Sequence, residues 1–400
     1  MIYVLYKALT FQVSSKKAGR NYCFLTENTK NQNNLKLFLL EDVELMKDIN
    51  LIMLKEYDFF TLFNIYLTEC KKGKLLLKNG TKMKNGSIQN YICLCKLLQN
   101  FCSHSKRKLR VKSLIKCSQQ EYIKEKMYWK KFYSALTKYM YGECNHFDNY
   151  VGASMKLIRS FFIYLKVEKG IDSRDIPKLF FISREEIPIV VLNAEQLKFL
   201  VSNASFELSL CMRLQKAKDV FVFGCAVGLR YSDLKILSPA NLEKNYKEYY
   251  LKIFSRKTST YTRVKLPQFA VDILLKYKGK LPTLLPTITL SNFNKSIREL
   301  AELAGWTQVI DKKRKKRGVL KSIKKAGSKA LFRFCDLLSS HTMRRTAITL
   351  YLSLGIPEQL VRRISGHSPG SKEFFRYVKY SEELLDLELN RAHEKFIGKN

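Results

Sequence analysis

The residues best suited to chemistry lie near the carboxyl end, in the segment 339–346, Ser-Ser-His-Thr-Met-Arg-Arg-Thr. A serine at 339 or 340 is a good helix N-cap, and it places His341 and Arg344 three residues apart on one helix face. The first turn of a helix attracts anions, more so when basic side chains point off it. This segment therefore predicts an anion-binding site.

Three further positions could join this site. Arg230 directly follows the apolar run 220–229, where a charge is costly unless it is paired or binds an anion. Asp233, three residues later, could orient the Arg230 guanidinium. His367 follows a predicted helix and a glycine, so the turn can bring it back toward the first histidine, and Tyr377 comes ten residues later.

Together these motifs resemble the tyrosine recombinase family, the phage-type integrases, from roughly residue 190 to 390. The family's first arginine box matches Gly-Leu-Arg-Tyr-Ser-Asp-Leu, and its HxxR and Gly-His boxes, hairpin lysine and nucleophile also have counterparts in the same order. The basic insert before HxxR resembles integrases of bacterial mobile elements. The candidate catalytic residues that the resemblance implies are Arg230, Lys257, His341, Arg344, His367 and Tyr377.

The chemistry of a phosphodiester fits these residue types. Arg230 and Arg344 can hold the non-bridging oxygens as charge builds on them. A tyrosine with a reference pKa of about 10 needs a proton acceptor, for which His341 is the candidate, and Lys257 could protonate the leaving 5′ oxygen. His367 would donate to a non-bridging oxygen or brace the site. The resemblance implies a 3′-phosphotyrosine intermediate, with no cofactor, metal or ATP.

Two of these assignments have rivals. Arg256 and Lys265 compete with Lys257, which alone has the Lys-Thr context. Tyr380 lies three residues after Tyr377, on a similar helical face; Tyr377 is preferred because it follows two apolar residues and a basic one.

The run of basic residues before HxxR can be a solvated charge run, a nuclear localisation signal or a DNA-contacting loop. Its position directly before the catalytic helix favours the last of these. The expected DNA-binding residues are Arg256, Lys312, Lys313, Arg314, Lys315, Lys316 and Arg317.

Hydrophobic periodicity indicates the elements that must position these residues. We expect a mainly α fold with a small β-hairpin or sheet (α+β). The resemblance implies that a core-binding domain and a catalytic domain form a clamp on DNA. Residues 1–50 are either an arm-type DNA-binding segment or a cap on the fold. The other predicted parts are a helical, SAM-like core-binding domain (51–175), a linker (176–187) and the catalytic domain (188–400), whose hairpin places strands at 251–254 and 263–266.

Composition agrees with a nucleic-acid partner. The 400 residues carry 72 Lys and Arg against 35 Asp and Glu, a net charge of +37, which is too large for a generic metabolic enzyme. The longest apolar run is too short to span a bilayer, and the ten scattered cysteines suit reduced thiols. We therefore expect a cytoplasmic protein that binds double-stranded DNA and no membrane. The resemblance to integrases of bacterial mobile elements further implies a bacterial, nucleoid-associated protein, a homo-tetramer at the synapse and accessory DNA-bending or directionality factors.

The leading hypothesis is a site-specific recombinase that integrates or excises a mobile element. One alternative is a catalytically silent DNA-binding accessory protein derived from a recombinase. The other is a topoisomerase of the type IB kind, which shares the chemistry but relaxes supercoils as a monomer without site preference.

Overall fold

The computed structural model describes residues 9–12, 16–17, 20–27, 36–39, 56–77, 79–115, 117–255, 260–368, 370–379, 389 and 393. The chain divides into two compact units. The first comprises residues 1–185 together with 315–319, and the second comprises residues 186–314 and 320–400. The division at 185/186 falls within the predicted linker.

Near the amino end lies a small antiparallel sheet in which β3 pairs with each of the other three strands. Its strands are β1 (Leu9–Gln12), β2 (Lys16–Lys17), β3 (Arg20–Glu27) and β4 (Lys36–Leu39).

The rest of the first unit is a helical bundle, as the sequence predicts. Caps define where two helices begin: the Asp58 carboxylate accepts a hydrogen bond from the Thr61 amide at 2.7 Å, and Ser118 and Glu121 form a reciprocal capping box. The elements are β5 (Glu56–Asp58), α2 (Phe59–Lys72), α3 (Asn85–Ser105), β6 (Arg110–Lys112), α4 (Gln119–Gly142), α5 (Asp148–Glu168) and the 3-10 helix η2 (Ile176–Leu179).

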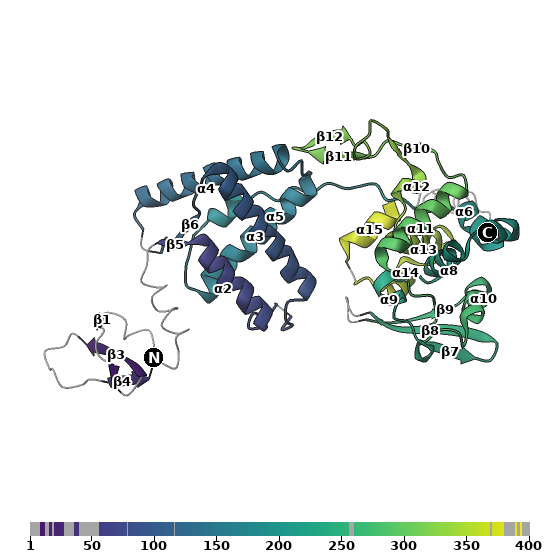
Figure 1. Ribbon diagram of the computed structural model, residues 1–400, viewed down its shortest axis with the longest axis horizontal. Helices are drawn as coiled ribbons and strands as arrows, with labels where there is room; N and C mark the ends of the chain where they lie inside the picture. The colour runs from purple at the N-terminus through teal and green to yellow at the C-terminus, as the bar shows by residue number, and fades with distance from the viewer. Residues whose placement is uncertain are drawn as a thin grey trace. The chain divides into compact units, whose positions relative to one another are not determined.

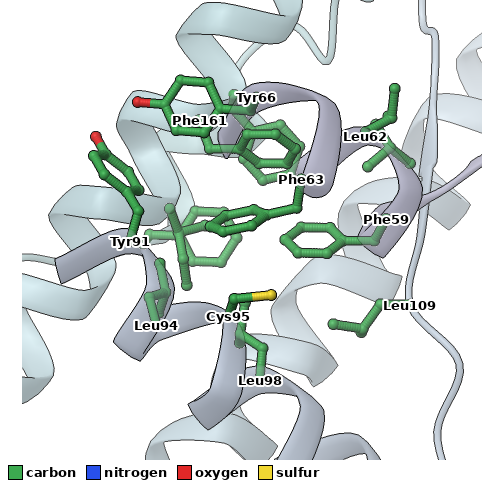
Figure 2. Close-up of a cluster of buried hydrophobic side chains, with 14 of the residues drawn as sticks. Phe59, Leu62, Phe63, Tyr66, Tyr91, Leu94, Cys95, Leu98, Leu109 and Phe161 are labelled. Carbon is green, nitrogen blue, oxygen red and sulfur yellow. The ribbon is translucent and has the colours of Figure 1, made fainter. Parts of the chain in front are cut away.

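Aromatic side chains fill the core of this bundle. Phe59 and Phe63 of α2 point toward Phe161 of α5, with ring centroids 5.2 and 4.8 Å apart respectively (Figure 2). The core continues into the predicted linker, because Ile176 and Phe180 are fully buried in it. The first part of segment 176–187 therefore packs against the bundle, because its side chains at 176 and 180 are apolar.

The second unit is built around a helix that is buried on all sides. From Ala217 to its end, every residue of α8 (Met212–Val227) is buried. Three later helices pack against it: α13 (Ser340–Ser353), α11 (Leu290–Leu303) and α10 (Gln268–Tyr277). Close approach of α13 depends on Gly224, since a Cβ there would lie 2.3 Å from the Met343 sulfur. The apolar run that is too short for a membrane is thus the central core helix.

The remaining elements of the second unit are drawn in teal to yellow in Figure 1. The strands β7, β8 and β9 form an antiparallel sheet in that order, and the predicted hairpin at 251–266 is confirmed with longer strands. Its helices before the sheet are α6 (Ala194–Ser202), α7 (Ala204–Ser209), α9 (Tyr231–Leu234) and the 3-10 helix η3 (Pro239–Asn241). The sheet and following helices are β7 (Leu242–Asn245), β8 (Glu248–Ser255), β9 (Thr260–Lys265), α10 (Gln268–Tyr277) and α11 (Leu290–Leu303). The carboxyl-terminal helices are α12 (Phe334–Leu337), α13 (Ser340–Ser353), α14 (Glu358–Ser365) and α15 (Lys372–Lys379).

The predicted basic loop forms regular structure instead. It contains β10 (Val309–Ile310), which pairs with β13 (Phe332–Arg333), and the hairpin of β11 (Lys313–Lys316) with β12 (Val319–Ser322). Arg317 and Gly318 turn the hairpin with φ angles of 55° and 79°. The Asp148 carboxylate holds this turn within the first unit, because it accepts hydrogen bonds from both turn amides at 2.8 and 2.9 Å.

Candidate functional site

The predicted anion site lies at the first turn of α13. Ser339 is the N-cap residue, and its amide donates to the Thr342 hydroxyl at 3.0 Å. His341 is exposed at this end, whereas Arg344, one turn further, is only 1% exposed. The two side chains of the HxxR motif therefore sit at different depths of one cavity, with the arginine at its floor.

Arg344 is held by contacts at both ends of its guanidinium fork. Its Nη1 donates to the carbonyl oxygen of Gly228 at 2.9 Å, and its Nη2 lies 3.1 Å from Nε2 of His367. Burial, and after it the nearby charge of Arg230, lowers the pKa of Arg344 to about 10. The side chain remains a cation at neutral pH, in a place where its charge is poorly solvated.

Arg230 reaches the same cavity from the end of the buried helix. Gly228 ends α8 with a φ of 65°, a left-handed conformation that turns the chain so that Arg230 becomes the N-cap residue of α9. The Arg230 Nη1 lies 3.9 Å from a carboxylate oxygen of Asp233. The expected orientation of Arg230 by Asp233 is thus present as a loose ion pair.

His367 is placed by the exit from α14, as predicted. Gly366 ends that helix with a φ of 62°, and the Ser365 hydroxyl lies 2.8 Å from Nδ1 of His367. Burial, followed by the charges of Arg344 and Arg230, lowers the pKa of His367 to about 3. The neutral ring can accept from Arg344 at Nε2 while Nδ1 donates to Ser365, because an arginine has no acceptor atom. This arrangement favours a bracing role for His367.

Tyr377 completes the cluster from α15. Its ring is 6% exposed and belongs to a small core with Ile348, Leu352 and Phe374, so the side chain has little freedom. The ring centroid lies 5.7 Å from that of His367. The Tyr377 side chain also interacts with the guanidiniums of Arg344 and of its neighbour in α13, Arg345.

These side chains line a single cavity of about 400 Å³ in the second unit. It brings together five of the six predicted catalytic residues: Arg230, His341, Arg344, His367 and Tyr377. Its remaining polar lining, not singled out from the sequence, consists of Arg345, Ser368, Ser371, Glu373 and Arg376. A cavity with this excess of cations over carboxylates can bind a phosphodiester, and Tyr377 carries a nucleophilic oxygen beside it.

Several predicted residues lie away from the cavity or outside the described residues. Lys257, Arg256 and the rival nucleophile Tyr380 belong to the second group. Lys265, the other rival to Lys257, is exposed and paired with Glu248 on the neighbouring strand.

The predicted DNA-binding run 312–317 forms the hairpin described above and does not line the cavity. Part of it is already occupied by protein contacts. The Lys316 ammonium donates to the Asn145 side chain at 2.6 Å, Arg317 stacks on the Tyr141 ring, and Lys312 covers the ring of Phe332.

Neither a metal site nor a membrane span is found in the described part of the chain. Its residues include no cluster of histidine, cysteine or carboxylate side chains that could hold a metal. Among the described helices, none is long and apolar enough to cross a membrane.

Comparison with solved structures shows which fold holds this cavity. A structure of a lambda integrase dimer bound to a COC′ core site matches with a TM-score of 0.51 and 13% identity, covering 94% of this chain and 95% of that chain. XerH site-specific recombinase bound to a palindromic difH substrate, in a post-cleavage complex, also matches at 0.51, with 14% identity over 82% of each chain. The chain has the tyrosine recombinase fold. No family model and no curated protein matches the sequence.

Proposed function

We propose that this protein is a site-specific DNA recombinase that cleaves and rejoins DNA strands through a 3′-phosphotyrosine, for integration or excision of a mobile element. One observation carries the proposal: Arg230, His341, Arg344, His367 and Tyr377, from separate parts of the sequence, line one cavity. The recombinase fold and the net charge of +37 support double-stranded DNA as the substrate.

The chemistry follows from where these groups lie. Arg230 and Arg344 bind the non-bridging oxygens of the scissile phosphate and stabilise the extra charge of the phosphorane. The Tyr377 oxygen attacks phosphorus while its proton passes to His341. An oxygen–phosphorus bond forms, and the bond from phosphorus to the 5′ oxygen breaks.

The leaving 5′ oxygen takes a proton, for which Lys257 is the proposed donor. Because one phosphoester replaces another, the bond energy is retained, and a 5′ hydroxyl can reverse the reaction on the same or another strand. Neither ATP nor a metal ion is required by this sequence of steps. A tetramer on two synapsed sites, with accessory bending or directionality factors, is the assembly that we propose for the exchange.

A covalent-trapping experiment tests the proposal and selects the target sequence in the same step. The full-length protein is incubated with a pool of nicked duplexes of randomised sequence, in which cleavage near the nick releases a short strand and blocks rejoining. Denaturing electrophoresis then separates protein-linked DNA, which is recovered and sequenced. We expect adducts that converge on a shared sequence.

The matched variants are Tyr377→Phe, which removes the proposed nucleophile, and Tyr246→Phe, which removes a hydroxyl from a 92% exposed tyrosine remote from the cavity lining. Only the first should abolish the adduct. Retained adduct in Tyr377→Phe would contradict the nucleophile assignment, and its loss only in Tyr380→Phe would favour that rival. Adducts with no shared sequence, together with plasmid relaxation, would favour a topoisomerase.

A further inference from the structure

Arg345 is a cavity residue to which the proposed chemistry gives no role. It follows Arg344 on α13, and its Nε atom is buried with no hydrogen-bond partner among the described residues. Burial lowers the pKa of this guanidinium, with the neighbouring Arg376 adding to the effect. A cation in such a place is costly unless an anion or a polar oxygen faces it.

Tyr377 lines the same cavity as Arg345, and its side chain interacts with this guanidinium. Helix α15 packs on α13 through Phe374, Ile348 and Leu352, and this contact holds the tyrosine ring against the face of α13. The Tyr377 side chain interacts with both Arg344 and Arg345. The two arginines are differently engaged, however, because the Arg344 fork is already bound to Gly228 and His367.

We infer that Arg345 is a positioning residue for the nucleophile, and that its guanidinium holds the Tyr377 oxygen and stabilises the phenolate that forms as the proton leaves. The inference rests on the proposed function. In the step, the tyrosine oxygen–hydrogen bond breaks, the proton passes to His341, and the electron pair left on oxygen forms the bond to phosphorus. Arg345 keeps all its protons and touches only the nucleophile.

Other charged groups also line the cavity around Tyr377, and the test must separate their effects from that of Arg345. Arg344 and His341 come from the same helix as Arg345, His367 follows α14, and Arg230 begins α9. The tyrosine's own helix contributes Glu373 and Arg376, whose Nη2 donates to the Ile187 carbonyl at 2.7 Å. Of the two arginines that interact with the Tyr377 side chain, only Arg345 lacks a direct place on the scissile phosphate in the proposed mechanism.

The test compares Arg345→Gln and Arg345→Lys with wild type on a nicked duplex recovered by the trapping experiment. Arg345→Gln should cleave at least about tenfold more slowly while binding the same duplex with nearly unchanged affinity. Arg345→Lys, which keeps the charge, should recover part of the rate. Raising the pH from 7 to 9 should accelerate the glutamine variant more than wild type, because hydroxide then supplies phenolate that the cation no longer favours.

The control is Arg363→Gln, which removes one positive charge from an exposed position on α14 outside the cavity lining. It should cleave like wild type. A glutamine variant at 345 that cleaves at the wild-type rate would overturn the inference. So would a rate loss matched by an equal loss of DNA affinity, or one that is the same at pH 7 and 9, since either would indicate a phosphate contact or a packing role.

A second measurement does not depend on activity. In the protein without DNA, Tyr377→Phe should lower the melting temperature of the wild type. It should lower the melting temperature of Arg345→Gln by less, because that variant already lacks the guanidinium that contacts the Tyr377 hydroxyl. Additive effects would refute the contact between the two side chains. If the melting effects are coupled but the wild-type protein forms no adduct with DNA, the contact stands and the proposed function is wrong.

Discussion

Replacing Arg344 by methionine should abolish strand cleavage and leave the protein as stable as before, or more stable. Burial, with the charge of Arg230 as the second cause, lowers the pKa of Arg344 from its usual range to about 10. That lowering corresponds to about 3 kcal/mol of cost for holding the charged form in the folded protein. The cost applies in full below pH 10 and is relieved only as the pH rises above 10, so it is present at neutral pH.

Methionine has a similar length and no charge, so it removes this cost. It also leaves the Gly228 carbonyl, which accepts from Arg344 at 2.9 Å, without that donor, a loss of about 1–3 kcal/mol. Nε2 of His367 loses the same donor at 3.1 Å, but this ring is only partly buried and can accept from water instead. The net change is between about zero and 2 kcal/mol in favour of folding. For a unit of this size, the melting temperature should therefore stay the same or rise by up to about 8 °C.

The assay is calorimetric melting of wild type, Arg344→Met and Ile348→Ala. Ile348 is 1% exposed on the same helix, and truncating it should cost about 2–5 kcal/mol. Inorganic phosphate should raise the melting temperature of wild type more than that of the methionine variant, since a bound anion stabilises the folded state and needs the cation. If Arg344→Met melts as low as Ile348→Ala, then Arg344 is a net contributor to stability and the reasoning is refuted.

Three other outcomes can be measured. The pKa of His367 is about 3 in the folded protein against a usual 6.5, so acidification through this range should destabilise the wild type. Between pH 7 and 5, His367→Gln should lose less stability than the wild type. Equal losses would contradict this expectation. Gly152→Ala should lower the free energy of unfolding in urea by about 3 kcal/mol or more, because its Cβ would lie 2.0 Å from the Ser183 carbonyl oxygen. Gly224→Ala should lower it by less, because its Cβ meets the flexible side chain of Met343. The reverse order would refute this reasoning. Affinity for a random duplex, followed by fluorescence anisotropy, should fall by roughly 10³–10⁵ between 50 and 200 mM salt if six to ten phosphates are bound, and a shallow slope would argue against that extent of contact.

Local signals in the sequence predict the backbone of the site well. The serine before HxxR is the N-cap of α13, and the glycine before His367 ends α14 in the left-handed conformation. Both follow from backbone chemistry within a few residues, so no tertiary information is needed. The sequence analysis gives no bounds for α9 or α15, the short helices that place Arg230 and Tyr377.

What the sequence does not contain is which side chains meet across elements. Arg345 and Arg376 each neighbour a motif residue, but their place in the cavity depends on how α15 packs against α13. The basic run 312–317 has the composition of a solvated loop, yet it forms a hairpin whose turn amides donate to Asp148, far away in sequence. Such contacts depend on long-range packing, which periodicity cannot report.

Gly228 joins two parts of the site that are usually considered separately. Its left-handed φ of 65° turns the chain toward Arg230, and its carbonyl oxygen is the acceptor for Arg344. A Cβ at this position would meet only Ala347 at 3.4 Å, so space does not forbid a larger residue; the backbone angle does. A substitution here would disturb both arginines that we propose to bind phosphate, and no single second change could repair the two together. In evolutionary terms, we expect position 228 to vary only in descendants that have already given up strand cleavage.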